Sequence, residues 1–151
     1  MYLHSSDIKD FDIPNHIKII HSAAFAESSI EGKFIIPSGV ETINYRAFRS
    51  CINLEEVNFL DKAADIYSEA FLDCINLKRI YLPRFTEIGT RCFFNCNNLK
   101  DIYFNGTYKE WENLYIGRAA FGTDLTQSPN TASTKILLHL SDGTSRKLED
   151  Y

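Results

Sequence analysis

The chain repeats a pattern about every 23 residues, and this period limits its fold more than any other feature. Phe25, Phe48 and Phe71 are each 23 residues apart, and Phe93 follows 22 residues later. A second series keeps the same steps and consists of Ile20, Ile43, Ile66 and Ile88. A fixed period of this length is typical of stacked-repeat architectures, in which each repeat contacts only its neighbours. We therefore expect a solenoid rather than a protein built around one central pocket.

Each repeat contains one segment with the alternation of a half-buried strand. The segments follow the pattern L-x-x-φ-x-φ, where φ is apolar, as in Leu54-Val57-Phe59, Leu77-Ile80-Leu82 and Leu99-Ile102-Phe104. Alternate apolar positions predict a strand with one face toward the core. Pro83 follows one of these segments, and Pro14 and Pro37 occupy the equivalent positions. Because proline cannot donate to a strand ladder, the strands are expected to end there.

The other half of each repeat has the form A-F-x-x-C, as in Ala47-Phe48-Arg49-Ser50-Cys51. The spacing of Phe and Cys predicts one or two turns of α- or 3₁₀-helix facing inward. Asn53, Asn76 and Asn98 follow this segment, where asparagine serves as a left-handed cap or bridges backbone groups between coils. We therefore expect each coil to contain a strand, a turn, a short helix and a turn.

The full pattern, φ-P-x-x-φ-x-x-I-x-x-x-A-F-x-x-C-x-x-L-x-x-φ-x-φ, resembles the BspA-like leucine-rich repeats. It stands in this chain as IPSGVETINYRAFRSCINLEEVNF, from Ile36 to Phe59, and covers most of residues 8–106. The resemblance implies an α/β solenoid that is right-handed and curved, with short parallel strands on the concave side and helical turns on the convex side. Bacterial members of this family are commonly surface proteins implicated in adhesion or protein binding.

The chain is expected to form one domain over residues 1–151, with repeats over about 1–106 and a C-terminal cap over about 107–151. Trp111, Leu114 and Tyr115 are expected to share one helical face against the last coil, with Trp111 as a core residue rather than a ligand platform. Asp142-Gly143 is a hairpin signal between a strand at Ile136–Leu140 and another at Thr144–Leu148. This hairpin would cover the end of the stack.

The N-terminal residues are already in register with the repeat, because MYLHSSDIKDFDIP aligns with AFAESSIEGKFIIP at residues 24–37. Tyr2 aligns with Phe25 and Phe11 with Phe34, so apolar side chains lie at the first coil. Solenoid ends need protection. The open alternatives are a longer array, coverage of Tyr2 and Phe11 by another copy in an end-to-end homo-oligomer, or a half coil that suffices.

The net charge is −4, and the hydrophobic fraction of 44% supports a folded core. The chain has no dense Lys/Arg cluster and no apolar stretch of membrane-spanning length, so neither a nucleic-acid partner nor membrane insertion is expected. The N-terminus has no export-signal pattern. The chain reads as soluble, and its location is open: the cell surface or secreted by family resemblance, cytoplasmic if the chain is complete.

Cys51, Cys74 and Cys96 each lie three residues after a repeated Phe, and Cys92 is the fourth cysteine. The leading interpretation is that they are small, buried free thiols at equivalent places in successive coils. A disulfide between neighbouring coils is geometrically conceivable, but three equivalent cysteines cannot all pair. A zinc site is the weakest alternative, because no second pair of ligands completes it. No metal and no cofactor are expected.

Two columns of outward-facing residues are expected on the strand face. The first alternates in charge through Asp10, Lys33, Glu56, Arg79 and Asp101, which favours a self-neutralising ladder. The second contains Asp12, Ile35, Asn58, Tyr81 and Tyr103. The tyrosines either support each other as a cross-strand pair or form an interface, since tyrosine is favoured at binding hot spots. The candidate protein-binding residues are Ile35, Asn58, Arg79, Tyr81 and Tyr103.

The chain has no pattern typical of a catalytic site. It contains no G-x-S-x-G, no phosphate-binding glycine loop and no H-E-x-x-H, and its four histidines have no metal-ligand spacing. We therefore expect a non-catalytic protein-binding solenoid, used as an adhesion or surface-interaction module through its concave strand face. The alternative is an intracellular scaffold that oligomerises through its open N-terminal coil.

Overall fold

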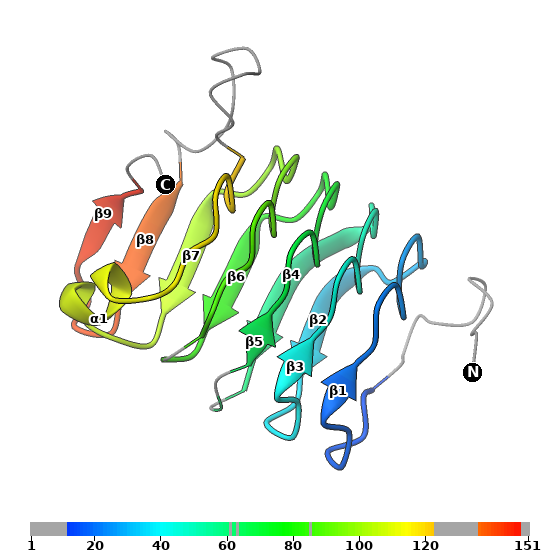
Figure 1. The fold of residues 1–151 in the computed structure, drawn as a ribbon. Helices are drawn as coiled ribbons and strands as arrows, with labels where there is room; N and C mark the ends of the chain where they lie inside the picture. The colour runs from blue at the N-terminus through cyan, green and yellow to red at the C-terminus, as the bar shows by residue number, and fades with distance from the viewer. Residues whose placement is uncertain (1–11, 61, 63, 85, 123–135, 149–151) are drawn as a thin grey trace.

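Figure 1 shows the computed structural model of the protein, in which successive coils are stacked side by side along one axis. The structure describes residues 12–60, 62, 64–84, 86–122 and 136–148. The strands of neighbouring coils pair with one another and form two sheets, one of six strands and one of three. This arrangement is a β-solenoid of parallel stacked strands, as the repeat predicts. Among the described residues, no helix has both the length and the apolar character needed to cross a membrane.

The larger sheet follows the predicted strand segments. Its strands, in spatial order, are β2 (Gly32–Ile36), β4 (Leu54–Phe59), β6 (Arg79–Leu82), β7 (Asp101–Phe104), β8 (Leu137–Leu140) and β9 (Ser145–Lys147). All neighbours are parallel except β8 and β9, which are antiparallel. Strand β2 ends directly before Pro37 and β6 directly before Pro83, so the predicted strand ends are confirmed.

A second, smaller sheet was not expected from the sequence. It contains β1 (Ile19–Ile20), β3 (Thr42–Ile43) and β5 (Asp65–Ile66), which pair in parallel. Single bridges from Ile66 to Ile88 and from Ile88 to Ile116 extend this ladder. The repeated isoleucines therefore lie in extended backbone, because their amide and carbonyl groups hydrogen-bond to the neighbouring coils.

The prediction of helix or 3₁₀ at the A-F-x-x-C segment is wrong, because this segment forms consecutive turns. Arg46 and Ser50 both have left-handed backbone, with φ of 57°, which interrupts any helix. The amide of Arg49 donates locally to the carbonyl of Arg46 at 3.1 Å, whereas the amide of Phe48 donates to Ala70 in the next coil at 2.8 Å. Local and inter-coil hydrogen bonds thus alternate along the segment.

The core is a stack of phenylalanine rings that runs along the solenoid. Neighbouring rings have centroids 4.9–5.6 Å apart and are nearly parallel, and they belong to Phe25, Phe48, Phe71, Phe93 and Phe121. The spacing is close to the separation of paired strands, so each coil adds one ring at the repeat distance. Phe121 and Ile116 continue their ladders beyond helix α1 (Tyr108–Glu112).

The repeated cysteines are buried free thiols that link successive coils by hydrogen bonds, in line with the leading interpretation. The Sγ of Cys51 donates to the carbonyl of Phe25 at 3.1 Å, and the Sγ of Cys74 donates to the carbonyl of Phe48 at 3.1 Å. Ser28 occupies the equivalent position one coil earlier and contacts Cys51 at 3.3 Å. This position therefore favours a small side chain with a donor hydrogen.

Two of the repeated asparagines, Asn76 and Asn98, have the second of the two roles expected for them. The amide nitrogens of Asn76 and Asn98 donate to the carbonyls of Ile52 and Ile75, each at 2.8 Å. Neither residue has positive φ, so neither is a left-handed cap. Both side chains instead bridge one coil to the coil before it.

The C-terminal part closes the stack with α1 and the β8–β9 hairpin. Thr107 and Glu110 form a capping box at the start of α1. Trp111 is fully buried and packs edge-on against Phe104, which confirms its role as a core residue. The expectation that Tyr115 shares its buried face is wrong: α1 ends at Glu112, and Tyr115 is 62% exposed.

Candidate functional site

The parallel register of the large sheet aligns the two predicted columns of outward residues. Lys33, Glu56, Arg79 and Asp101 are direct partners on β2, β4, β6 and β7. The second column contains Ile35, Asn58, Tyr81 and Tyr103, and β8 extends it with His139. The remaining expected member of the charged column, Asp10, lies outside the described residues.

The charged column is largely neutralised by its own ion pairs. Glu56 accepts from Lys33 Nζ at 3.2 Å and from Arg79 Nε at 3.0 Å. The hydrogen bond to Glu56 raises the pKa of the Arg79 guanidinium above its ordinary value. Because Glu56 lies between two cations, this column presents little unbalanced charge to a ligand, as the alternation predicted.

The second column is an aromatic stack at its C-terminal end. The rings of Tyr81 and Tyr103 are 4.5 Å apart and 7° from parallel, and those of Tyr103 and His139 are 4.5 Å apart and 14° from parallel. The predicted cross-strand tyrosine pair is therefore present, and it is extended by a histidine. We name Tyr81, Tyr103 and His139 the aromatic stack.

Hydrogen bonds fix the His139 ring at the end of the aromatic stack. Its Nε2 lies 2.8 Å from Asp101 Oδ1, and its Nδ1 lies 2.8 Å from Ser145 Oγ on β9. A neutral imidazole donates from one nitrogen and accepts at the other, so both contacts are satisfied in one tautomer. Asp101 is the last residue of the charged column, and its contact with His139 links this column to the second one.

His139 was missed as a site residue because it follows the repeats after a long interruption. The segment Ile136–Leu140 predicts a strand, and the alternation of Leu138 and Leu140 places His139 on the outer face. The partner strand and its register do not follow from that alternation, because the 23-residue period no longer applies.

The aromatic stack borders a shallow depression of about 320 Å³ on the strand face. Its floor and rim include Asn58, Pro83, Asn105 and Ser141 in addition to the stack. Both tyrosines are partly exposed, and burial raises the pKa of Tyr81. Ile35, earlier in the same column, is 42% exposed. The face therefore combines aromatic area with hydroxyl, amide and imidazole groups.

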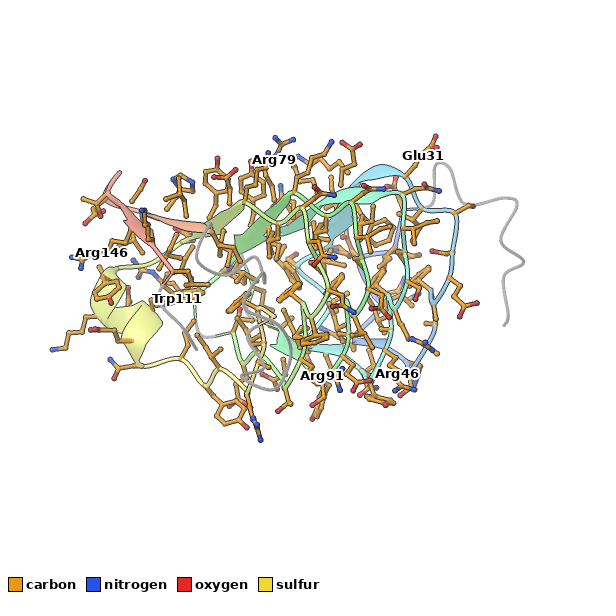
Figure 2. The ribbon with its side chains drawn as sticks, turned by 90° about the horizontal axis from the view of Figure 1, so that it is seen from above. Glu31, Arg46, Arg79, Arg91, Trp111 and Arg146 are labelled. Atoms are coloured by element: carbon orange, nitrogen blue, oxygen red, sulfur yellow. The ribbon has the colours of Figure 1, made fainter. Side chains whose placement is uncertain are left out.

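A second cluster of charges lies on the turns, away from the strand face. Figure 2 shows Arg46 and Arg91 on the opposite side of the molecule from Arg79. Glu69 accepts from Arg46 Nε at 2.7 Å and lies 4.0 Å from Arg91 Nη1. Burial raises the pKa of Glu69, but the hydrogen bond from Arg46 and other favourable contacts outweigh it, and the pKa is lowered overall.

No group of three or more His, Cys, Asp or Glu side chains within the described ranges is arranged to hold a metal ion. Burial raises the pKa of the Cys92 thiol, and contact with Cys74 together with burial raises that of Cys51. Such thiols are inert at neutral pH. Tyr2 and Phe11, the expected end-to-end contacts, lie outside the described residues.

One comparison with known proteins identifies the family. No curated protein and no solved structure matches the chain. A family model described as the BspA-type leucine-rich repeat region matches residues 1–123 in six copies. This match covers most of the chain and agrees with the stacked parallel strands and the repeated Phe, Ile and Cys ladders. The chain therefore belongs to the BspA-type leucine-rich-repeat family.

Proposed function

We propose that this protein is a non-catalytic recognition module that binds a partner protein through the outer face of its large sheet. The family resemblance implies a curved solenoid with its strands on the concave side, and the proposal includes this curvature. The observation that carries it is the aromatic stack of Tyr81, Tyr103 and His139, which is partly exposed beside an open depression. Leucine-rich-repeat solenoids are generally protein-binding modules.

The stack is suited to binding because its side chains are held in place before a ligand arrives. Each tyrosine contacts an aromatic neighbour at 4.5 Å, and His139 is hydrogen-bonded at both ring nitrogens. Little side-chain entropy therefore remains to be lost on association. Tyrosine also combines apolar area with a hydroxyl, and this combination favours it at the centre of interfaces.

The neighbouring charged column sets the chemistry of the partner. Lys33 and Arg79 share Glu56, and Asp101 is hydrogen-bonded to the His139 ring, so the charged side chains beside the stack already have partners within the protein. A strongly charged ligand gains little from such a surface. We infer a partner segment with apolar and neutral polar side chains, bound through the tyrosines, Ile35 and the amide of Asn58.

The biological setting that we propose is adhesion or another surface interaction. It rests on the resemblance to family members with such roles and not on any contact in this chain.

The proposal is tested with a phage-displayed library of random linear peptides, selected on the immobilised protein. Enriched peptides are then measured by calorimetry against the wild type and a Tyr81→Ser/Tyr103→Ser variant. We expect the variant to bind at least about 30-fold more weakly, because truncating one hot-spot residue costs about 2 kcal/mol or more.

An Ile52→Ser/Ile75→Ser variant is the matched control, because it also replaces two exposed large side chains by serine but at residues outside the lining of the depression. It should bind the peptides as the wild type does. Equal binding by all three proteins, or loss of binding only in the control, would contradict the proposal.

A further inference from the structure

We propose that a groove beside the small sheet is a second binding site, which accepts an arginine side chain of a partner protein. The groove has a volume of about 240 Å³ and lies against β5 and the Ile88 and Ile116 bridges that continue its ladder. Its sides are formed by Tyr67, Tyr115, Asp65 and Glu87. It belongs to a different sheet from the aromatic stack, so it does not depend on the function proposed above.

Gly89 lines this groove, and Gly117 occupies the equivalent position one coil further on, outside the groove lining. Gly89 and Gly117 follow the isoleucines of their coils, at the place where Tyr67 carries a large side chain one coil earlier. A Cβ on Gly89 would lie 2.4 Å from Ser68 N, and a Cβ on Gly117 would lie 2.3 Å from Thr90 N. Only glycine allows this close approach of the coils. The position next to Tyr67 on the following coil therefore has no side chain.

The two carboxylates at the groove are not neutralised by basic side chains of the described residues, in contrast to three glutamates on neighbouring coils. Glu41, Glu56 and Glu69 each contact two basic side chains. Asp65 and Glu87 are exposed on adjacent coils and have no ion pair or side-chain hydrogen bond with any described residue. The groove therefore carries negative charge that the protein itself leaves unbalanced.

The two tyrosines supply aromatic surface next to these carboxylates. Tyr67 is 52% exposed and Tyr115 is 62% exposed. A cation over a tyrosine ring is attracted by the ring's quadrupole. Arg118, which follows Gly117, does not line the groove.

An arginine side chain matches this set of groups better than other cations do. Its planar guanidinium stacks on aromatic rings and donates in pairs to carboxylates, and it is more weakly hydrated than an ammonium group. Bound in the groove, it would stack on Tyr67 or Tyr115 and donate to Asp65 and Glu87. The hydroxyls of Ser68 and Thr90 lie at the same groove and can accept further hydrogen bonds.

The test is a titration of the ¹⁵N-labelled protein with N-acetyl-arginine amide at low salt, followed by NMR. We expect saturable shifts of the backbone amides of Tyr67, Gly89 and Thr90, which line the groove. The neutral analogue N-acetyl-citrulline amide should bind at least about fivefold more weakly, because it lacks the charge for the ion pairs and the cation–π contact. N-acetyl-lysine amide should also bind more weakly than the arginine probe.

An Asp65→Asn/Glu87→Gln variant should lose about fivefold in affinity for the arginine probe. The matched control is Asp12→Asn/Glu112→Gln, which changes the net charge equally at exposed residues outside the groove lining. This control should leave the affinity unchanged. Preserved amide dispersion in both variants shows that the fold is intact.

Several results would overturn the inference. Equal binding of the citrulline probe would exclude recognition of the charge, and equal binding of the lysine probe would exclude recognition of the guanidinium. Equal weakening by both double variants would show a general electrostatic effect. None of these results bears on peptide binding at Tyr81 and Tyr103, so this failure and failure of the proposed function are distinguishable.

Discussion

The imidazole of His139 stacks on the ring of Tyr103 with their centroids 4.5 Å apart, although the two residues belong to different parts of the chain. Tyr103 lies in the repeats, and His139 lies in the hairpin that closes the stack. The hairpin therefore contributes a side chain to the candidate binding face. It is part of this candidate face as well as the end of the described stack of strands.

The contact between Tyr103 and His139 should stabilise the fold measurably. In a double-mutant cycle with Tyr103→Leu and His139→Leu, we expect a coupling free energy of about 0.5–1.5 kcal/mol, typical of aromatic pairs. Urea denaturation of the four proteins provides the measurement. A cycle from Tyr81→Leu and His139→Leu is the control, since Tyr103 separates these rings, and it should give a smaller coupling. Strictly additive effects for Tyr103 and His139 would contradict the stacking.

The phenylalanine core should be most sensitive near its middle. Phe71 is fully buried between Phe48 and Phe93, and its replacement by alanine would leave a cavity. We expect Phe71→Ala to lower the free energy of unfolding by about 3–5 kcal/mol in urea denaturation. Ile52→Ala, at a residue that is 48% exposed, should change it by less than about 1 kcal/mol. Similar losses for the two variants would be inconsistent with the ring stack as the core.

The thiols of Cys51, Cys74 and Cys92 should be unreactive in the folded protein. All three are buried, and their pKa values are raised, so very little thiolate is present near pH 8. We expect Ellman's reagent to modify none of them until denaturant unfolds the chain. Mass spectrometry of the labelled peptides identifies which cysteines react. Fast labelling of any of these three cysteines without denaturant would refute the packing.

The Arg46–Glu69 contact predicts a loss of stability in acid. The pKa of Glu69 is lowered in the folded state, so the unfolded chain takes up a proton first as the pH falls. The stabilisation is therefore complete above the unfolded-state pKa of about 4.3 and is lost as the pH falls through the lower folded-state value.

A Glu69→Gln variant should have a lower free energy of unfolding at pH 7, by at most about 1 kcal/mol, because Arg46 is partly exposed. Its stability should also fall less steeply than that of the wild type below about pH 5. Urea denaturation at a series of pH values measures both quantities. Parallel curves for the two proteins would rule out a contribution from this ion pair.

The strands could be predicted from the sequence because their signals are local. Alternation at Val57 and Phe59 and the proline after Leu82 identify strand faces and ends within a few residues. The nearly equal spacing of the repeats then predicts the register, in which Tyr81 is aligned with Tyr103.

The turns and the second sheet could not be predicted in the same way. The spacing of Phe48 and Cys51 suits a helix as well as consecutive turns, and the left-handed residues that decide between them, Arg46 and Ser50, are not glycines. The strands of the small sheet contain only two residues each, too few for an alternation to be recognised. Their backbone is extended because hydrogen bonds to neighbouring coils hold it there.

A crystal structure of the protein with its tightest selected peptide would show whether the aromatic stack is the binding site. We expect the peptide on the outer face of the large sheet, in contact with Tyr81 and Tyr103 and filling the depression beside His139. A peptide bound at the turns or at the small sheet, with the rings of Tyr81 and Tyr103 still open to solvent, would contradict the proposed function.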